Sequence, residues 1–261
     1  MRILYTAELI GKAGVFTLKK ALDELKERYK YDFMIVCADG ATGGNGLGLN
    51  HAAYINKLGA NAITLGECCF YKKDLTENLS SIRYVLRPDN LNPDAPGTGS
   101  HVFKAGNEKV AVAVLLGQNN FPRIHANSPF TNLSSLLERL RKQTPYVIVD
   151  FHAQASAEKK TFFYAADGHC SAVIGSHTRV QTADETIMQG GTACISDAGR
   201  TGSLQSVGGC EINSRIKEYL TGIPDWTKDA WDDLELQGVF LDIGKDGKAL
   251  SIERVKIKVD R

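Results

Sequence analysis

The stretch Ala172-Val173-Ile174-Gly175-Ser176-His177-Thr178-Arg179-Val180-Gln181-Thr182-Ala183-Asp184 combines a strand pattern with side chains that bind ligands. The β-branched run 172–174 predicts a buried strand, and Gly175 is expected to end it. His177 and Arg179 follow directly. In an open α/β sheet, ligands and metals bind at the loops beyond the carboxyl ends of the strands. The stretch therefore predicts a functional loop at one edge of such a sheet.

The same pattern occurs earlier in the chain. Residues 146–150 predict a second buried strand, and Phe151 and His152 follow it. Two histidines placed after two core strands form an arrangement that a metal ion uses. Two ordinary loop histidines are the alternative, and His152 and His177 alone do not decide between the two interpretations.

Three further strands are each predicted to end just before an acidic residue. The pairs are 3–6 with Glu8, 33–37 with Asp39, and 60–65 with Glu67. A parallel sheet would bring these acids and both histidines to one edge, where the carboxylates would repel one another unless a cation compensated them. Imidazole and carboxylate ligands together suit Zn, Mn or Fe better than Ca or Mg. The pattern favours a metal-dependent hydrolase over a dinucleotide enzyme.

Other segments complete an α/β pattern. Residues 40–48 contain five glycines and predict a loop, but they lack the signatures of a P-loop and of a dinucleotide fingerprint. Helical periodicity predicts helices near 17–28, 50–58, 133–140 and 212–220. Segments 102–104 and 110–116 are expected to pair, as are 239–243 and 249–257. The Asp246-Gly247 pair predicts a type I′ turn in the second hairpin.

Composition narrows the class of protein. The chain has 261 residues, of which 43% are hydrophobic and 23% charged, and neither a repeat nor a linker is evident. One domain spanning 1–261 is therefore expected. The net charge of +1 gives no footprint for nucleic acid or a membrane surface, and the longest apolar run, 110–116, is too short to cross a bilayer. Six cysteines without C-x-x-C spacing and no secretory layout favour the cytoplasm.

Several motifs, taken in order, resemble those of a known family. They are Leu9-Ile10-Gly11-Lys12, Val149-Asp150-Phe151-His152-Ala153, Gly175-Ser176-His177-Thr178 with Val180–Asp184, and Ser196-Asp197-Ala198-Gly199 with Thr201-Gly202. The chain resembles the bacterial YmdB-like branch of the calcineurin-like metallophosphoesterases over nearly its whole length. The resemblance implies a single-domain, four-layer αββα sandwich of the α/β class. It also implies a two-metal site that hydrolyses phosphodiesters, in relatives including 2′,3′-cyclic nucleotides.

The site departs from that family pattern at most working positions. Glu8 stands where the family has a metal-binding Asp, and Asp39-Gly40 where it has Glu-Asn. Glu67-Cys68 replaces an Asn-His pair, and Arg179 replaces the second His of a His-x-His motif. His152 and His177 alone are retained. Compared with the family, this is a degenerate active site.

Arg179 is the most consequential of these replacements. A guanidinium cannot ligate a metal, but it can place a positive charge where a metal stood and grip a carboxylate in bidentate fashion. We expect Arg179 to pair with Glu8, so that an ion pair replaces the first metal site. The second site keeps a plausible ligand set for one divalent transition metal (Mn, Fe or Zn): Asp39, Glu67, His152 and His177. Three carboxylates then balance one divalent metal and Arg179.

Two classes of function follow. The first is a metallophosphoesterase that hydrolyses phosphodiesters or cyclic nucleotides weakly through a mononuclear site, with Arg179 stabilising transition-state charge. The second is a catalytically inactive relative that binds a nucleotide or a protein partner. The expected small-molecule partner is a phosphorylated compound or nucleotide; substrate-binding residues are not identified, and a homo-oligomer is left open. Cys68 is a candidate nucleophile near a cation, or a thiol that fills the space left by His. His125 lies in a loop, 117–129, that could cover the pocket.

Overall fold

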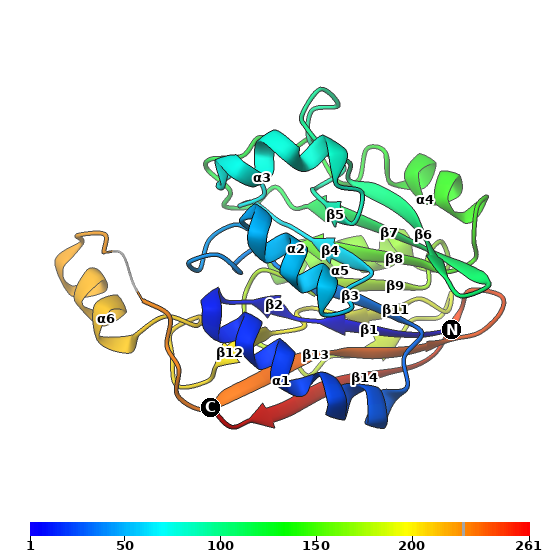
Figure 1. The fold of residues 1–261 in the computed structure, drawn as a ribbon. Coiled ribbons are helices and arrows are strands. Elements are labelled where there is room, and N and C mark those ends of the chain that lie inside the picture. Colours follow the sequence, from blue (N-terminus) through cyan, green and yellow to red (C-terminus); the bar gives the residue numbers. More distant parts are fainter. Residues whose placement is uncertain (226–227) are drawn as a thin grey trace.

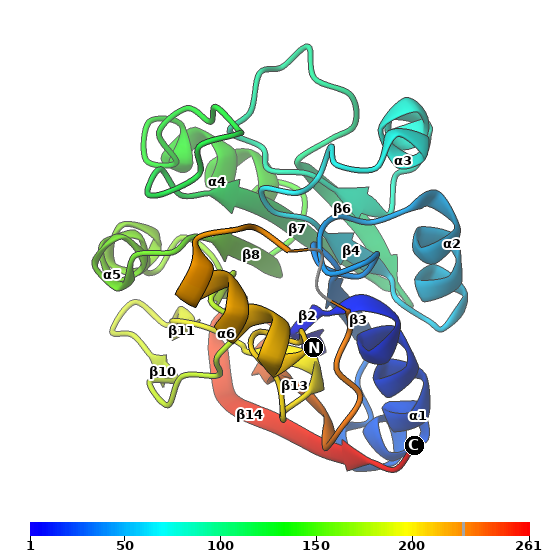
Figure 2. The ribbon, with the colours of Figure 1, turned by 90° about the vertical axis from the view of Figure 1, so that its left-hand side faces the viewer.

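The computed structural model describes residues 1–225 and 228–261. Two β-sheets pack face to face, and helices cover the outer face of each (Figures 1 and 2). Figure 2 shows α1, α2 and α3 on one side of the strands and α4 and α5 on the other. This is the expected four-layer αββα sandwich. The described helices are α1 (Gly11–Tyr29), α2 (Leu49–Lys57), α3 (Lys73–Asn78), α4 (Leu133–Arg141), α5 (Ser156–Ala166) and α6 (Ile212–Thr221).

The first sheet has the order β2-β12-β13-β1-β3-β4-β5. The strand β14 lies outside this order and pairs antiparallel with β13. Strands β1, β3, β4 and β5 run parallel, so their carboxyl ends meet at one edge of the sheet. The strands are β1 (Arg2–Thr6), β2 (Glu8–Leu9), β3 (Phe33–Cys37), β4 (Ala62–Thr64), β5 (Val85–Leu86), β12 (Arg200–Ser203), β13 (Leu234–Ile243) and β14 (Ala249–Val259).

The second sheet has the order β10-β11-β9-β8-β7-β6. Its strands β7, β8, β9 and β11 are parallel, and the register of β8 with β9 places His152 opposite Ser176. The ends of these two strands therefore lie side by side. The strands are β6 (Ser100–Ala105), β7 (Glu108–Leu116), β8 (Val147–His152), β9 (Ala172–Ser176), β10 (Thr186–Ile187) and β11 (Ala193–Ile195).

Alternation along the strands creates three apolar layers. In β1, Ile3 and Tyr5 face the layer between the sheets, whereas Leu4 faces α1–α3. A third layer lies between the second sheet and helices α4 and α5, where Phe151 and Phe162 stack with ring centroids 4.0 Å apart. The central parallel strands of both sheets, such as β3, β8 and β9, are thus buried on both faces, which fixes the positions of their ends.

Two local expectations are corrected. Helix α1 begins at Gly11 rather than near residue 17, because Gly14 lets the helix approach β12 closely: a Cβ there would lie 2.5 Å from the carbonyl oxygen of Thr201. The predicted type I′ turn is wrong. Of the pair Asp246-Gly247, only Gly247 has a positive φ (84°), and its N–H donates to the carbonyl oxygen of Gly244 (2.9 Å). This is a type I turn followed by a left-handed glycine.

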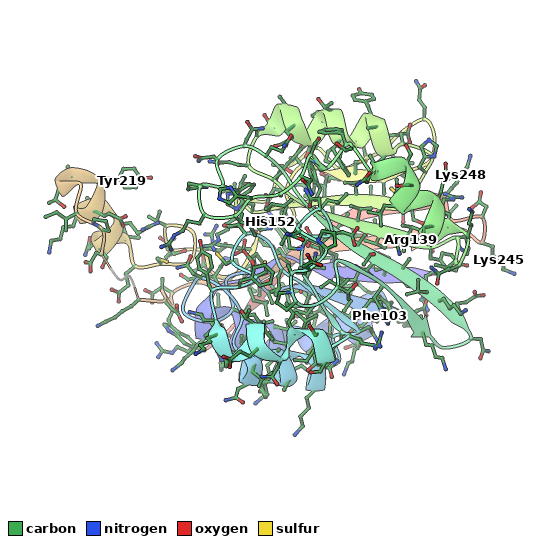
Figure 3. The ribbon with its side chains drawn as sticks, turned by 90° about the horizontal axis from the view of Figure 1, so that it is seen from above. Phe103, Arg139, His152, Tyr219, Lys245 and Lys248 are labelled. Atoms are coloured by element: carbon green, nitrogen blue, oxygen red, sulfur yellow. The ribbon has the colours of Figure 1, made fainter. Side chains whose placement is uncertain are left out.

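Helix α6 stands away from the two sheets (Figure 1). It contains no buried residue, and Tyr219 and Leu220 are among its exposed apolar side chains. Figure 3 shows Tyr219 far from His152, which lies in the body of the molecule. Among the helices of the described residues, none combines the length and apolar composition needed to cross a membrane.

The packing of β9 against β11 gives a stability test. A Cβ on Gly175 would overlap the backbone carbonyl of Ser196, so Gly175→Ala must shift one of the two strands. We expect the free energy of unfolding to fall by about 3 kcal/mol or more. The control is Gly48→Ala, because Gly48 has a φ of −85° and an added Cβ would meet its nearest atom at 3.4 Å. Its cost should be about 1 kcal/mol or less. Urea unfolding midpoints that coincide for both variants would contradict this account of the packing.

Candidate functional site

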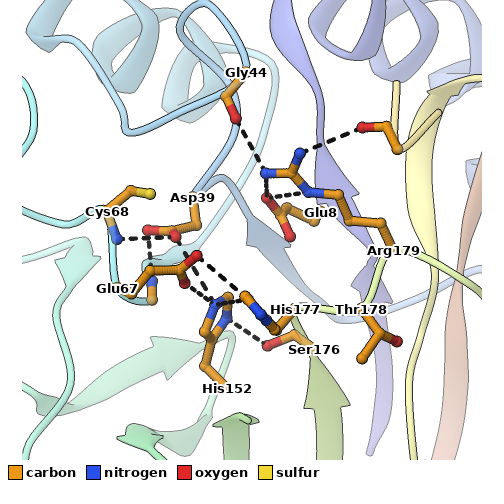
Figure 4. A network of polar contacts seen from close by, with 12 residues as sticks. Glu8, Asp39, Gly44, Glu67, Cys68, His152, Ser176, His177, Thr178 and Arg179 are labelled. Carbon is orange, nitrogen blue, oxygen red and sulfur yellow. Dashed lines mark hydrogen bonds and ion pairs between the residues drawn. The ribbon is translucent and has the colours of Figure 1, made fainter. Parts of the chain in front are cut away.

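Six polar side chains from both sheets meet at one edge of the sandwich (Figure 4). Glu8 lies in β2, not in a loop as expected, because β2 pairs with β12. The other five lie at or just beyond the ends of β3, β4, β8 and β9, as the sequence predicted: Asp39, Glu67, His152, His177 and Arg179. The structure therefore brings all the expected metal-site residues together.

Glu67, His152 and His177 converge on one point. Their ligand atoms all lie within 4.8 Å of one another. The Nδ1 atom of His177 is 3.3 Å from Oε1 of Glu67 and 3.2 Å from Nε2 of His152, and Oε2 of Glu67 contacts the same Nε2 atom. Two imidazoles and a carboxylate at such spacing are a typical ligand set for a divalent transition metal.

Asp39 provides a further acidic group beside this cluster. Its side chain is buried, and its oxygens accept hydrogen bonds from the backbone N–H groups of Gly66 (2.7 Å) and Cys68 (3.1 Å). Oδ2 of Asp39 lies 3.9 Å from Nε2 of His152. Burial and then the charge of Glu67 raise the pKa of Asp39 well above its usual range. A cation between these two carboxylates would offset that repulsion.

His152 is oriented by a chain of hydrogen bonds behind it. The Ser176 hydroxyl donates to Oδ1 of Asp150 (2.7 Å), and the Tyr5 hydroxyl donates to Oδ2 of Asp150 (2.7 Å). Because the Ser176 hydroxyl donates its proton to Asp150, its oxygen must accept a hydrogen bond from Nδ1 of His152 (2.9 Å). This orientation directs Nε2 of His152 at Glu67. Burial lowers the pKa of His152, but the Glu67 carboxylate outweighs it and raises the pKa to about 10.

The protonated imidazole of His152 thus neutralises Glu67 across their contact. Burial raises the pKa of Glu67, but His152 lowers it by more, so Glu67 is ionised. A divalent cation would take over this role from the proton on Nε2, because metal ligands must be deprotonated. The donor set and its supporting hydrogen bonds fit such a cation.

The loop that carries His177 and Arg179 has an unfavourable backbone. Both residues have a positive φ (98° and 60°), which costs energy for side chains other than glycine. Thr178 between them donates to Oδ2 of Asp197 through its N–H (2.9 Å) and its hydroxyl (2.7 Å). Lys159 donates to the same oxygen (3.0 Å) and to the carbonyl of Ser176.

The sequence reasoning missed Lys159 and gave Asp197 no role. Helix α5 itself was not predicted, since the buried Lys159 interrupts its apolar face of Phe162, Phe163 and Ala166. A lysine at this position among buried aromatic residues was the available signal, because lysine is almost never fully buried without a partner.

The expected ion pair between Arg179 and Glu8 is confirmed. Nη2 and Nε of Arg179 both donate to Oε1 of Glu8, at 2.7 and 3.1 Å. The expected fork across both carboxylate oxygens is wrong. Oε2 of Glu8 is buried and has no hydrogen-bond partner among the described residues. The remaining contacts of Arg179 go to the carbonyl oxygens of Gly44 (3.0 Å) and Gly208 (3.3 Å). The geometry therefore fixes a permanent positive charge beside Glu8.

Cys68 lies beside Asp39 as a buried, free thiol. Burial, and then the charges of Asp39 and Glu67, raise the pKa of Cys68, so the thiol is neutral. A neutral thiol is a poor nucleophile, and this favours the packing role over the nucleophilic one.

The loop 117–129 does lie over the site, but through Phe121 rather than His125. The ring centroid of Phe121 is 5.0 Å from that of His177 and 6.1 Å from that of His152. Its edge-on contact with His177 places an apolar ring at the border of the cluster. Phe121 was not singled out from the sequence, where an aromatic residue in a polar loop carries no distinctive spacing.

A sequence profile of YmdB-like proteins matches residues 4–255. The chain belongs to the YmdB-like family. This YmdB-like chain is 35% identical, over all of its length and 98% of the relative, to the 2′,3′-cyclic-nucleotide 2′-phosphodiesterase of Bacillus subtilis (strain 168).

Solved structures agree with the family and the fold. A novel phosphatase from Mycoplasma pneumoniae superimposes on the YmdB-like chain with a TM-score of 0.92 and 30% identity, covering 99% of this chain and 93% of the other. A hypothetical protein from Thermus thermophilus superimposes with a TM-score of 0.91 and 28% identity, covering 99% of each chain. A putative 5′-nucleotidase from Staphylococcus aureus shares the fold over 55% of its own length, at 16% identity and a TM-score of 0.61.

The buried pair behind the loop gives the second prediction. Both Lys159 and Asp197 are only 1% exposed, so Lys159→Met leaves a buried carboxylate without its cation. The free energy of unfolding should fall by about 3–5 kcal/mol, and adding Asp197→Asn should recover part of the loss. Lys73→Met is the control, because the Lys73–Glu77 pair is exposed and should contribute less than about 1 kcal/mol. Equal losses in the two single variants, measured by urea unfolding, would contradict the stabilising role of the Lys159–Asp197 pair.

Proposed function

We propose that the chain is a metal-dependent phosphoesterase that hydrolyses a phosphodiester through a mononuclear site. The observation that carries this proposal is the convergence of Glu67, His152 and His177 beside the fixed charge of Arg179. Asp39 completes the ligand set for one divalent transition metal (Mn, Fe or Zn). The phosphodiesterase named among its relatives supports a cyclic nucleotide as the diester.

A divalent metal at these ligands would polarise a phosphoryl oxygen and lower the pKa of water. The chain's own residues hold that centre in place. The Ser176 hydroxyl fixes the ring of His152, and Asp197 and Lys159 fix the loop that presents His177. Phe121 packs against His177 and His152 and borders the site with an apolar ring.

Arg179 acts in this proposal as a fixed charge rather than as a clamp on phosphate. Four of its five N–H groups already donate, two to Glu8 and one each to Gly44 and Gly208. It therefore offsets acidic charge and stabilises the negative charge of the transition state from nearby. With one divalent metal, the three carboxylates of Glu8, Asp39 and Glu67 are balanced.

The inactive binding module is not favoured. The candidate metal ligands and the hydrogen bonds that orient them are all in place, and a catalytically inactive relative would not need oriented metal ligands. The altered positions instead predict slow turnover. In this proposal the site lacks a second metal to stabilise the attacking and leaving oxygens together, and the neutral thiol of Cys68 does not replace the acidic imidazole of the family pattern.

Activity tests the proposal directly. With manganese and a 2′,3′-cyclic nucleotide, we expect turnover well below that of a binuclear relative, and His152→Ala should reduce it by at least about 10²–10³-fold. Cys68→Ala is the matched control, because it alters a buried neighbour whose neutral thiol takes no part in the proposed reaction. A His152→Ala variant with full activity would refute the site. A Cys68→Ala variant with none would assign Cys68 the nucleophilic role.

The metal stoichiometry tests the substitution of an ion pair for a metal. Arg179→Ala should destabilise metal-free protein by about 3–5 kcal/mol, since Glu8 is 1% exposed and loses its cation. Added manganese should restore part of this loss, because a cation that binds only the folded state stabilises it. Arg179→His combined with Glu8→Asp should raise the bound metal from one equivalent to two.

Arg254→Ala serves as the control for that series. The Arg254–Glu185 pair is partly exposed and lies outside the site, so its removal should cost about 1 kcal/mol or less and leave the metal content unchanged. If the double variant never binds more metal than the parent, Arg179 does not occupy a metal position.

A further inference from the structure

A second feature adjoins the metal site. A cavity of about 700 Å³ is lined by Gly43, Asn45, Phe70, Tyr71, Lys72 and Arg123. Its lining contains two aromatic rings, two basic groups and one amide, but no carboxylate. Neither Lys72 nor Arg123 forms a salt bridge with any of the described residues. The cavity therefore offers uncompensated positive charge beside an aromatic surface.

One wall of the cavity continues directly from the metal ligands. The chain turns after Glu67, and the N–H of Tyr71 donates to the carbonyl oxygen of Cys68 (3.0 Å). A four-residue turn of this kind keeps its first and last Cα atoms within about 7 Å. Tyr71 thus lies about one turn away from Glu67.

The opposite wall also starts at the metal site. Phe121 contacts His177 and His152, and Arg123 follows it by two residues on the same loop. The guanidinium carbon of Arg123 lies 5.8 Å from the ring centroid of Tyr71. Both walls therefore lead from the reacting centre to one arginine–tyrosine pair.

The glycine-rich segment 40–48 forms the third side. Gly43, Gly44 and Gly46 all have a positive φ (65°, 77° and 83°). A Cβ on Gly46 would lie 3.1 Å from both the carbonyl oxygen of Cys68 and Cβ of Tyr71. The segment can therefore pack this closely against Cys68 and Tyr71 because residue 46 is a glycine. The carbonyl of Gly44 accepts from Arg179, which connects this side to the ion pair (Figure 4).

We propose that this cavity binds the base of a nucleoside phosphodiester, with the base stacked against Tyr71 and Arg123 while its phosphate lies at the metal site. Tyr71 is 41% exposed, so its side chain is accessible to a ligand. Aromatic rings and guanidinium groups both stack on bases, and every base has a π-face. Asn45 offers amide donors and an acceptor to the base edge. The inference rests on the proposed function, because it places the base of the substrate proposed for the same site.

The experiment compares two cyclic diesters that differ only in the base: adenosine 2′,3′-cyclic phosphate and ribose 2′,3′-cyclic phosphate. Wild-type protein should prefer the nucleoside. Tyr71→Leu should raise KM for the nucleoside about tenfold, in line with the usual contribution of base stacking. Its kcat/KM for the ribose diester and its metal content should stay unchanged. Arg123→Gln should act in the same direction.

Tyr54→Leu is the matched control, because Tyr54 is similarly exposed (38%) on α2 but does not line the cavity. Equal kcat/KM for both diesters in the wild type would overturn the proposal. So would a Tyr71→Leu variant that loses activity equally on both.

Binding separates this proposal from the proposed function. Calorimetric titration with adenosine 3′-monophosphate and ribose 3-phosphate needs no turnover. Tighter binding of the nucleotide that is lost in Tyr71→Leu supports the base site even if the protein hydrolyses neither diester. Equal binding of the two compounds overturns the base site even if hydrolysis is observed.

Discussion

The ion pair between Arg179 and Glu8 joins the two sheets at the edge where the site lies. Glu8 belongs to β2 of the first sheet, and Arg179 follows β9 of the second. The contact of Glu67 with His152 and the hydrogen bond of Tyr5 to Asp150 also join the first sheet to the second. A buried charge without a partner is strongly destabilising, so the pair constrains how the two sheets meet.

The remaining parts of the site compensate for the cost of that arrangement. The loop that presents Arg179 adopts an unfavourable backbone, and the buried charges of Lys159 and Asp197 hold it there. Arg200 adds a hydrogen bond to the carbonyl oxygen of Arg179 (2.8 Å). The guanidinium is thus fixed from both its backbone and its side chain. A fixed charge needs no reorganisation during a reaction, which is the condition for effective electrostatic stabilisation.

Much of this could be predicted from the sequence. Buried strand patterns located the strand ends, and the residue types there indicated a metal. The Arg179–Glu8 pair followed from charge and from the family pattern. The supporting contacts could not be predicted, because their partners are distant in sequence: Tyr5 and Asp150 are 145 residues apart. Helical periodicity did not predict α5, because the buried Lys159 lies within the apolar face of that helix and is stabilised by a tertiary contact with Asp197. The aromatic cavity beside the glycine loop likewise exists only in three dimensions.

The central claim is that Arg179 holds one of two metal positions and leaves the other functional. Electron paramagnetic resonance of protein saturated with Mn²⁺ tests it most directly, because an isolated ion and a spin-coupled pair give different hyperfine patterns. The account predicts the spectrum of an isolated Mn²⁺ ion, with one equivalent bound per chain, that disappears in His152→Ala. The spectrum of a spin-coupled pair in the unaltered protein would contradict it.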